Sequence, residues 1–172
     1  MKYALILLII SMLSCNQKKD EPVAIAVQEM QNSLELKVYD FDGLEKFLHQ
    51  EDDKVYVVNF WATWCAPCVK ELPYFEKLQG EYKSQNIEVL LISLDFPNQY
   101  NTKLKPFIQE NKLQSQVVAL NDVDMNTWLP KVDENWSGAI PATIIYTKDK
   151  RQFYEQSFTY ESLENEVKQF IN

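Results

Sequence analysis

The sequence predicts an α/β domain in which a mostly parallel sheet is covered by helices on both faces. Segments with the pattern of strands alternate with segments that have the period of amphipathic helices, as in sheets built from strand–helix–strand units. Two strand-like segments, 54–61 and 87–95, are nearly continuous apolar runs, which is typical of strands buried on both faces. A tight turn at 148–151 joins the last two strand-like segments and predicts an antiparallel hairpin at the end of the sheet.

The other expected strands are shorter and less uniformly apolar. The segment 34–39 alternates apolar and polar residues, as a strand with one exposed face does. Pro141 lies near the start of the segment 140–147, where a proline leaves the strand ladder intact. In chain order the expected strands cover residues 34–39, 54–61, 87–95, 116–120, 140–147 and 152–158.

Helical periodicity separates these strands. Asp42 and Glu45 have the spacing of a capping box at the start of the first helix. Pro73 is expected to kink the second helix without ending it, because the apolar stripe continues beyond the proline. The segment 124–136 is ambiguous and reads as a short helix broken near Pro130. The expected helices cover residues 42–50, 68–83, 101–112 and 161–171.

Composition excludes several classes of function. A formal net charge of −8 and a pI near 4.7 argue against a nucleic-acid partner, which selects for a basic face. No glycine-rich phosphate-binding motif is present, and no cofactor is expected. The chain has three cysteines and one histidine, His49, which is read as a surface residue. Because these ligands fall in separate places, a four-ligand metal site is not expected.

The N-terminus has the features of an export signal. Lys2 precedes an apolar run at 4–13, which is shorter than the roughly 20 residues that span a bilayer. The run ends at Cys15 and resembles the lipobox of bacterial lipoproteins, in which this cysteine is acylated after cleavage. An ordinary signal peptide cut elsewhere is the alternative. The predicted organisation is a signal peptide at 1–14, a lipidated N-terminus and tether at 15–32, and a globular domain at 33–172.

The remaining two cysteines, Cys65 and Cys68, lie between an expected strand and an expected helix. At that junction the Cys65 sulfur faces unpaired backbone N–H groups and the positive end of the helix dipole, and both favour the thiolate. Cys68 lies one turn later and nearer the core. Cys65 is therefore the expected nucleophile toward a disulfide, and Cys68 the cysteine that resolves the mixed disulfide. Pro67, early in the helix, restricts the loop at no cost in hydrogen bonds. A structural pair of buried thiols is the alternative.

Two segments resemble a known superfamily. FWATWCAPC at 60–68 and GAIPATIIY at 138–146, together with the strand–strand–helix ending, are similar to thioredoxins. Within that superfamily, VVNFWATWCAPCVKELP at 57–73 resembles the membrane-tethered thiol–disulfide oxidoreductases of the TlpA/ResA type. The resemblance covers roughly residues 34–172. It implies a thioredoxin fold with an extra strand and helix inserted within 96–136, before the strand that contains the Ile-Pro pair.

The same resemblance implies an activity, a location and partners. The chain is expected to reduce disulfides of bacterial envelope proteins, such as apocytochromes c before haem attachment. The domain is expected in the periplasm, held at the membrane by the lipid on Cys15, with a membrane protein as its electron donor. An oxidant or isomerase of the same fold remains an alternative, because the potential depends on how strongly the Cys65 thiolate is stabilised.

The resemblance also assigns roles to further residues. It implies that the Ile140–Pro141 bond is cis, faces the cysteines and offers backbone groups to an extended substrate; a trans proline at a strand start is the alternative. Glu71 matches a glutamate of the tethered branch, whereas Asn59 stands where general thioredoxins have an aspartate. The helical spacing places Glu71 beside the apolar stripe, so burial should raise its pKa and let it exchange a proton with Cys68. A glutamate on the helix surface is the alternative.

Three aromatic residues near the motif, Trp61, Trp64 and Tyr74, are expected to frame the rim of the active site or else to pack in the core. Trp128 and Trp136 fall in the inserted segment, which is expected to influence the choice of partner.

Two other functions fit the residues less well. A peroxidase of the peroxiredoxin type needs a threonine three residues before its cysteine and an arginine nearby. Here that position is Ala62, Thr63 is one residue off, and the only arginine, Arg151, lies in a late turn. A non-catalytic binding module with the same fold is disfavoured by the intact pair of cysteines.

Overall fold

The computed structural model describes residues 35–171, which fall within one compact unit, Leu34–Asn172. The expected signal peptide, the tether and Cys15 lie outside the described residues. Among the helices of residues 35–171, none is long and apolar enough to cross a membrane.

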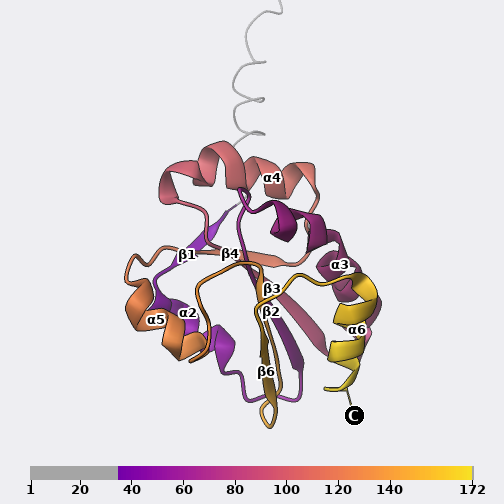
Figure 1. The fold of residues 1–172 in the computed structure, drawn as a ribbon. Helices are drawn as coiled ribbons and strands as arrows, with labels where there is room; N and C mark the ends of the chain where they lie inside the picture. The colour runs from indigo at the N-terminus through magenta and orange to yellow at the C-terminus, as the bar shows by residue number, and fades with distance from the viewer. Residues whose placement is uncertain (1–34, 172) are drawn as a thin grey trace, which may run out of the picture. The chain divides into compact units, whose positions relative to one another are not determined.

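Within this described part, six strands form one sheet in the order β1-β4-β3-β2-β5-β6 (Figure 1). The first four strands in this order are parallel, β5 is antiparallel to β2, and β6 is antiparallel to β5. The predicted parallel sheet with a terminal hairpin is therefore confirmed. The strands are β1 Lys37–Tyr39, β2 Val55–Trp61, β3 Ile87–Ser93, β4 Gln116–Leu120, β5 Ala142–Tyr146 and β6 Arg151–Tyr154.

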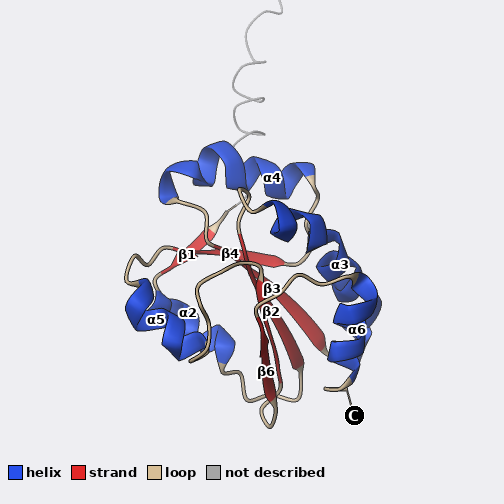
Figure 2. Ribbon diagram, in the orientation of Figure 1, coloured by secondary structure: helices blue, strands red, loops and turns tan. Residues whose placement is uncertain are grey.

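Helices cover both faces of the sheet (Figure 2). Helices α3, α4 and α6 pack on one face, and α2 and α5 pack on the other. Short 3₁₀ turns at Lys46–Leu48, Lys83–Gln85 and Pro97–Gln99 and a π turn at Tyr100–Leu104 extend or join them. The helices are α2 Phe41–Glu45, α3 Ala66–Tyr82, α4 Lys105–Glu110, α5 Met125–Val132 and α6 Tyr160–Lys168.

The alternation of side chains along β2 divides the core into two layers. Val57 and Trp61 pack under α3 and α6, whereas Val58 and Phe60 pack under α2 and α5. All four side chains are fully buried, as the apolar run predicts. The same alternation turns the polar side chain of Asn59 toward α3, the helix that carries the second cysteine.

The first helix begins earlier than predicted and uses a different cap. Asp40 accepts a hydrogen bond from the Gly43 N–H at 2.9 Å and is the N-cap. The predicted capping box of Asp42 and Glu45 is wrong, because both residues lie inside the helix. Asp42 still interacts favourably with the helix dipole from the first turn.

Helix α5 continues through Pro130, where a break is predicted. The proline removes the hydrogen bond to the Asn126 carbonyl, but Asn126 and Pro130 are both exposed, so water can bond to the freed oxygen. Strand β4 and helix α5 lie between β3 and the strand that follows Pro141, which is the insertion that the resemblance implies.

Candidate active site

Cys65 and Cys68 lie at the junction of β2 and α3 and are joined in a disulfide. Cys65 is the N-cap of α3, and the Cys68 N–H points to Cys65 Sγ with 3.3 Å between nitrogen and sulfur. Once the disulfide is opened, Cys65 Sγ faces the unpaired N–H groups and the positive end of the helix dipole. Both stabilise a thiolate at this position.

The two cysteines differ in access. Cys65 is 6% exposed, whereas Cys68 is completely buried. Pro67 lies in the first turn of α3, where its missing N–H costs no helical hydrogen bond. An incoming disulfide can therefore reach Cys65 but not Cys68.

The Ile140–Pro141 bond is cis, as the resemblance implies. The Ile140 carbonyl oxygen lies 3.6 Å from Cys65 Sγ. Antiparallel pairing of β5 with β2 explains this contact: Ala142 pairs with Phe60, so the start of β5 meets the end of β2.

Glu71 is 1% exposed and lies one turn after Cys68 on α3. One carboxyl oxygen accepts a hydrogen bond from the Asn59 amide at 3.1 Å, and the other accepts from the Phe158 N–H at 2.7 Å. Burial raises the pKa of Glu71 to about 7, although these two donors favour the carboxylate and oppose the rise. Asn59 also donates to the Thr143 hydroxyl at 3.1 Å, so the network ties α3 to two strands.

A second buried carboxylate, Asp95, holds the turn before Cys65, and it is a residue that the sequence-based prediction missed. Asp95 is 2% exposed and accepts hydrogen bonds from the Thr63 N–H at 3.0 Å and the Thr63 hydroxyl at 2.5 Å. The Ser93 hydroxyl donates to it at 2.8 Å. A signal was present, because an acidic residue comes two positions after a buried strand that ends at the same edge of the sheet as β2.

The aromatic residues near the motif fall into different environments. Trp64 is 53% exposed and stacks on Phe96 with ring centroids 6.3 Å apart, whereas Tyr74 is half-buried. The placement of Trp61 on the rim is wrong: its side chain is completely buried beside Phe107. The reason is the strand alternation, which turns Trp61 into the core under α3.

Other residues considered from the sequence are not part of this site. The Arg151 guanidinium donates to the carbonyl oxygens of Leu48 and Val132 at 2.9 and 3.0 Å. His49 is exposed. In residues 35–171, no three His, Cys, Asp or Glu side chains are grouped as metal ligands would be.

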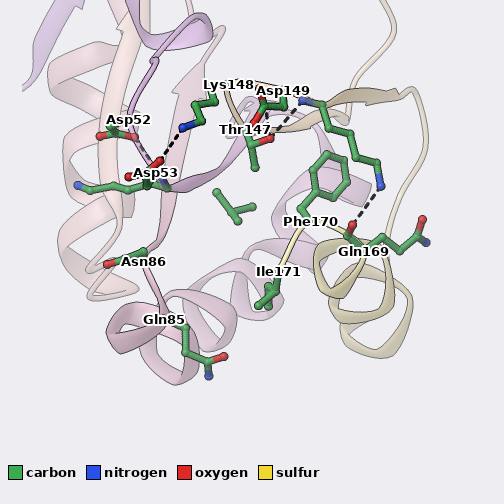
Figure 3. Close-up of a pocket in the computed structure, with 13 residues that line it drawn as sticks. Asp52, Asp53, Gln85, Asn86, Thr147, Lys148, Asp149, Gln169, Phe170 and Ile171 are labelled. Atoms are coloured by element: carbon green, nitrogen blue, oxygen red, sulfur yellow. Dashed lines mark hydrogen bonds and ion pairs between the residues drawn. The ribbon is translucent and has the colours of Figure 1, made fainter.

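A polar cavity of about 410 Å³ lies at the start of β2 (Figure 3). The cysteines follow the other end of this strand. The two lysines of the β5–β6 turn are engaged there. Lys148 pairs with Asp53 at 2.8 Å, and Lys150 donates to the Gln169 carbonyl oxygen at 3.1 Å. We assign this cavity no part in the redox chemistry.

Comparisons with known proteins agree with this geometry. A family model described as "AhpC/TSA family" matches residues 27–151. A thiol-disulfide oxidoreductase ResA of Bacillus cereus is 30% identical over 113 residues, which cover 65% of this chain and 60% of the relative. ResA of Halalkalibacterium halodurans is 40% identical over 58 residues, 34% of this chain and 33% of the relative. The matches thus span about one third to three fifths of the length of these relatives.

Solved structures share the fold. A thioredoxin-related protein from Neisseria meningitidis serogroup B superposes with a TM-score of 0.58 at 25% identity, over 69% of this chain and 86% of that one. A putative thiol:disulfide interchange protein DsbE from Chlorobium tepidum superposes with a TM-score of 0.57 at 18% identity, over 81% of this chain and 95% of that one.

Proposed function

The chain belongs to the AhpC/TSA family and has a thioredoxin fold, and on that premise we propose that it is a thiol–disulfide oxidoreductase. The observation that carries the proposal is the Cys65–Cys68 pair at the N-terminus of α3, with the Ile140 carbonyl 3.6 Å from Cys65 Sγ. This arrangement combines an accessible nucleophile, a buried resolving thiol and a partly exposed residue, Ile140, whose backbone carbonyl lies beside them.

The reaction proceeds in two exchanges. In the reduced protein the Cys65 thiolate attacks one sulfur of a substrate disulfide, and the other substrate sulfur leaves as a thiolate that takes up a proton. The Cys68 thiolate then attacks Cys65 Sγ, forms the intramolecular disulfide and releases the second substrate thiolate. The substrate gains two electrons and the protein loses two, which a dithiol donor must return.

Glu71 is the proposed proton acceptor for Cys68. Cys68 must lose its proton before it attacks, and a carboxyl group with a pKa of about 7 can take that proton near neutral pH. Glu71 lies one helical turn from Cys68, on the buried side of α3. Unchanged titration of both thiols in Glu71→Gln would contradict this role.

We further propose that the domain is held at a bacterial cell envelope by a lipid on Cys15. Its substrates are then disulfide-containing envelope proteins, apocytochromes c among them, and a membrane protein supplies the electrons. The apolar run before Cys15 and the resemblance to the tethered oxidoreductases support this setting.

Trapping tests the proposed activity directly. The Cys68→Ser variant can attack a substrate disulfide but cannot resolve the mixed disulfide that results. It should therefore accumulate an adduct on Cys65 that mass spectrometry detects. In envelope extracts this adduct identifies the partners. Cys65→Ser is the control and should form no adduct and reduce no insulin disulfides. Insulin reduction that survives Cys65→Ser would contradict the proposal. A reduction potential of about −270 mV for the Cys65–Cys68 pair favours a reductant, and one of about −120 mV favours an oxidant.

The structure disfavours the peroxidase alternative. Ala62 has no hydroxyl to offer to a peroxide, and the Arg151 guanidinium is engaged with the Leu48 and Val132 carbonyls. Peroxide consumption by the reduced wild type should therefore be no faster than the slow oxidation of an ordinary accessible thiolate.

A further inference from the structure

An apolar groove of about 380 Å³ lies beside the redox pair. Of the residues at 35–171, five large apolar side chains are exposed, and four of these line the groove. They are Trp64, Phe96, Val123 and Met125, exposed by 53%, 58%, 96% and 42%. Exposed apolar surface is unfavourable in water, so a cluster of large apolar side chains of this kind is typical of a binding surface.

Three connections at the carboxyl ends of parallel strands build the groove. Trp64 follows β2, Phe96 follows β3, and Val123 and Met125 lie where β4 leads into α5. The Trp64 and Phe96 rings stack at 20° between planes and form one wall. Val123 and Met125, which also line the groove, come from the insertion, which makes the insertion part of the surface around the cysteines.

The groove is continuous with the redox site. Trp64 immediately precedes Cys65, and Ile140 lines the groove while its carbonyl oxygen lies 3.6 Å from Cys65 Sγ. A group that fills the groove is therefore held within reach of the nucleophile. This position indicates that the occupant belongs to the molecule whose disulfide Cys65 attacks.

The charged residues that line the groove indicate which kind of group can bind there. Of the described residues that line it, none is lysine, arginine or histidine, and the charged ones are Asp95 and Asp122. Both carboxylates already accept hydrogen bonds, Asp95 from Thr63 and Asp122 from the Phe41 N–H at 3.2 Å. Small anionic disulfides therefore find no counter-charge here, whereas an uncharged apolar group finds a complementary surface.

We propose that this groove binds a large apolar side chain, aromatic or long aliphatic, that lies close in sequence to the disulfide of an extended polypeptide substrate. The assignment rests on the proposed oxidoreductase activity and names the substrate class of that site. Val123 and Met125, which the insertion contributes, determine the preference for such substrates.

A panel of disulfide peptides tests this substrate class. The parent peptide carries alanines around a mixed disulfide, and each variant moves one phenylalanine through the positions on either side of the cysteine. The reduced full-length chain is mixed with each peptide, and the second-order rate constant is followed by tryptophan fluorescence. At least one of the phenylalanine peptides should react about tenfold faster than the parent peptide. In the double variant Val123→Ser/Met125→Ser, most of this ratio between the two rate constants should be lost.

Val38→Ser is the matched control, because Val38 is also an exposed apolar residue, at 43%, but does not line the groove. It should keep the wild-type ratio. Phe96→Ser provides a second groove variant and should also lower the ratio. Equal rates across the wild-type panel, or a ratio that persists in both groove variants, would overturn the inference.

The neutral disulfide of mercaptoethanol separates the two proposals. If the wild type cannot reduce it through Cys65, the proposed activity itself fails. If the wild type reduces it but shows no peptide preference, only the groove assignment fails.

Discussion

Glu71 has a buried carboxyl group whose two hydrogen-bond partners are both neutral, the Asn59 amide and the Phe158 N–H. Two neutral donors only partly replace the hydration that the ionised form loses on burial. The pKa is therefore raised to about 7, well above the value of about 4.3 for a solvated glutamate. A residue in this state can hold or release a proton within the pH range where thiols react.

This shift makes stability depend on pH. Between about pH 4 and pH 7 the folded protein binds the Glu71 proton and the unfolded chain does not, so stability falls as pH rises. We expect the free energy of unfolding of the oxidised wild type to drop by on the order of 3 kcal/mol, relative to Glu71→Gln, across this range. Urea unfolding of both proteins at a series of pH values measures the difference.

The control for this experiment is Glu110→Gln, which changes an exposed glutamate at the end of α4. It should keep the pH dependence of the wild type. Parallel stability curves for the wild type and Glu71→Gln would contradict the assignment of a raised pKa to Glu71.

Asp95 connects two elements of the site, the turn that follows β2 and the end of β3. The Leu94 N–H donates to the Trp61 carbonyl at 2.8 Å, and Asp95 then binds both the N–H and the hydroxyl of Thr63. These bonds fix the turn that places Cys65 at the N-terminus of α3. Thr63, which fits no peroxidase role, thus has a positioning role for the nucleophile.

Substitution of Thr63 tests this connection. Thr63→Val keeps the shape but removes the hydroxyl, which leaves Asp95 short of one donor and should cost about 1–3 kcal/mol of stability. With the turn less constrained, alkylation of Cys65 by iodoacetamide should slow at pH 7 and its pH profile should move upward. Thr63→Ser should restore both the stability and the alkylation profile of Cys65. Thr102→Val, at an exposed threonine, should change neither of them. A wild-type alkylation profile in Thr63→Val would refute the positioning role.

Part of the site could be predicted from the sequence. Helical spacing alone places Glu71 on the buried side of α3, and the strand–helix junction places Cys65 at a helix N-terminus. Asp95 could not be predicted with its partner, because its contact with Thr63 depends on β2 and β3 pairing with Trp61 opposite Ser93. The burial of Trp61 was predictable, since Trp61 is in phase with Val57 along β2, and the rim placement neglected that alternation.

At the scale of the whole molecule, the sequence predicts the layers and the terminal hairpin but not the order of the strands. Strand β4 lies between β1 and β3, and nothing in the local pattern of residues 116–120 specifies those neighbours. That order brings the carboxyl ends of β2, β3 and β4 to one edge of the sheet. The cysteines, Asp95 and the apolar groove meet there because the connections that follow these parallel strands share that edge.

The formal net charge of −8 acts on substrates over a longer range than any of these contacts. A negative field attracts cationic reactants and repels anionic ones, and salt weakens both effects. The Debye length falls from about 30 Å at 0.01 M salt to about 8 Å at 0.15 M. The reduced protein should therefore react more slowly with the dication cystamine as salt is added, and faster with the dianion dithiodiglycolate.

The neutral disulfide of mercaptoethanol is the control. Its rate constant should change little with salt, which separates electrostatic steering from any effect of salt on the cysteines. Because each disulfide is compared with itself across salt concentrations, differences in thiol pKa among the three reagents cancel. A salt response of the same sign for both charged reagents would show that the net charge does not govern their approach to Cys65.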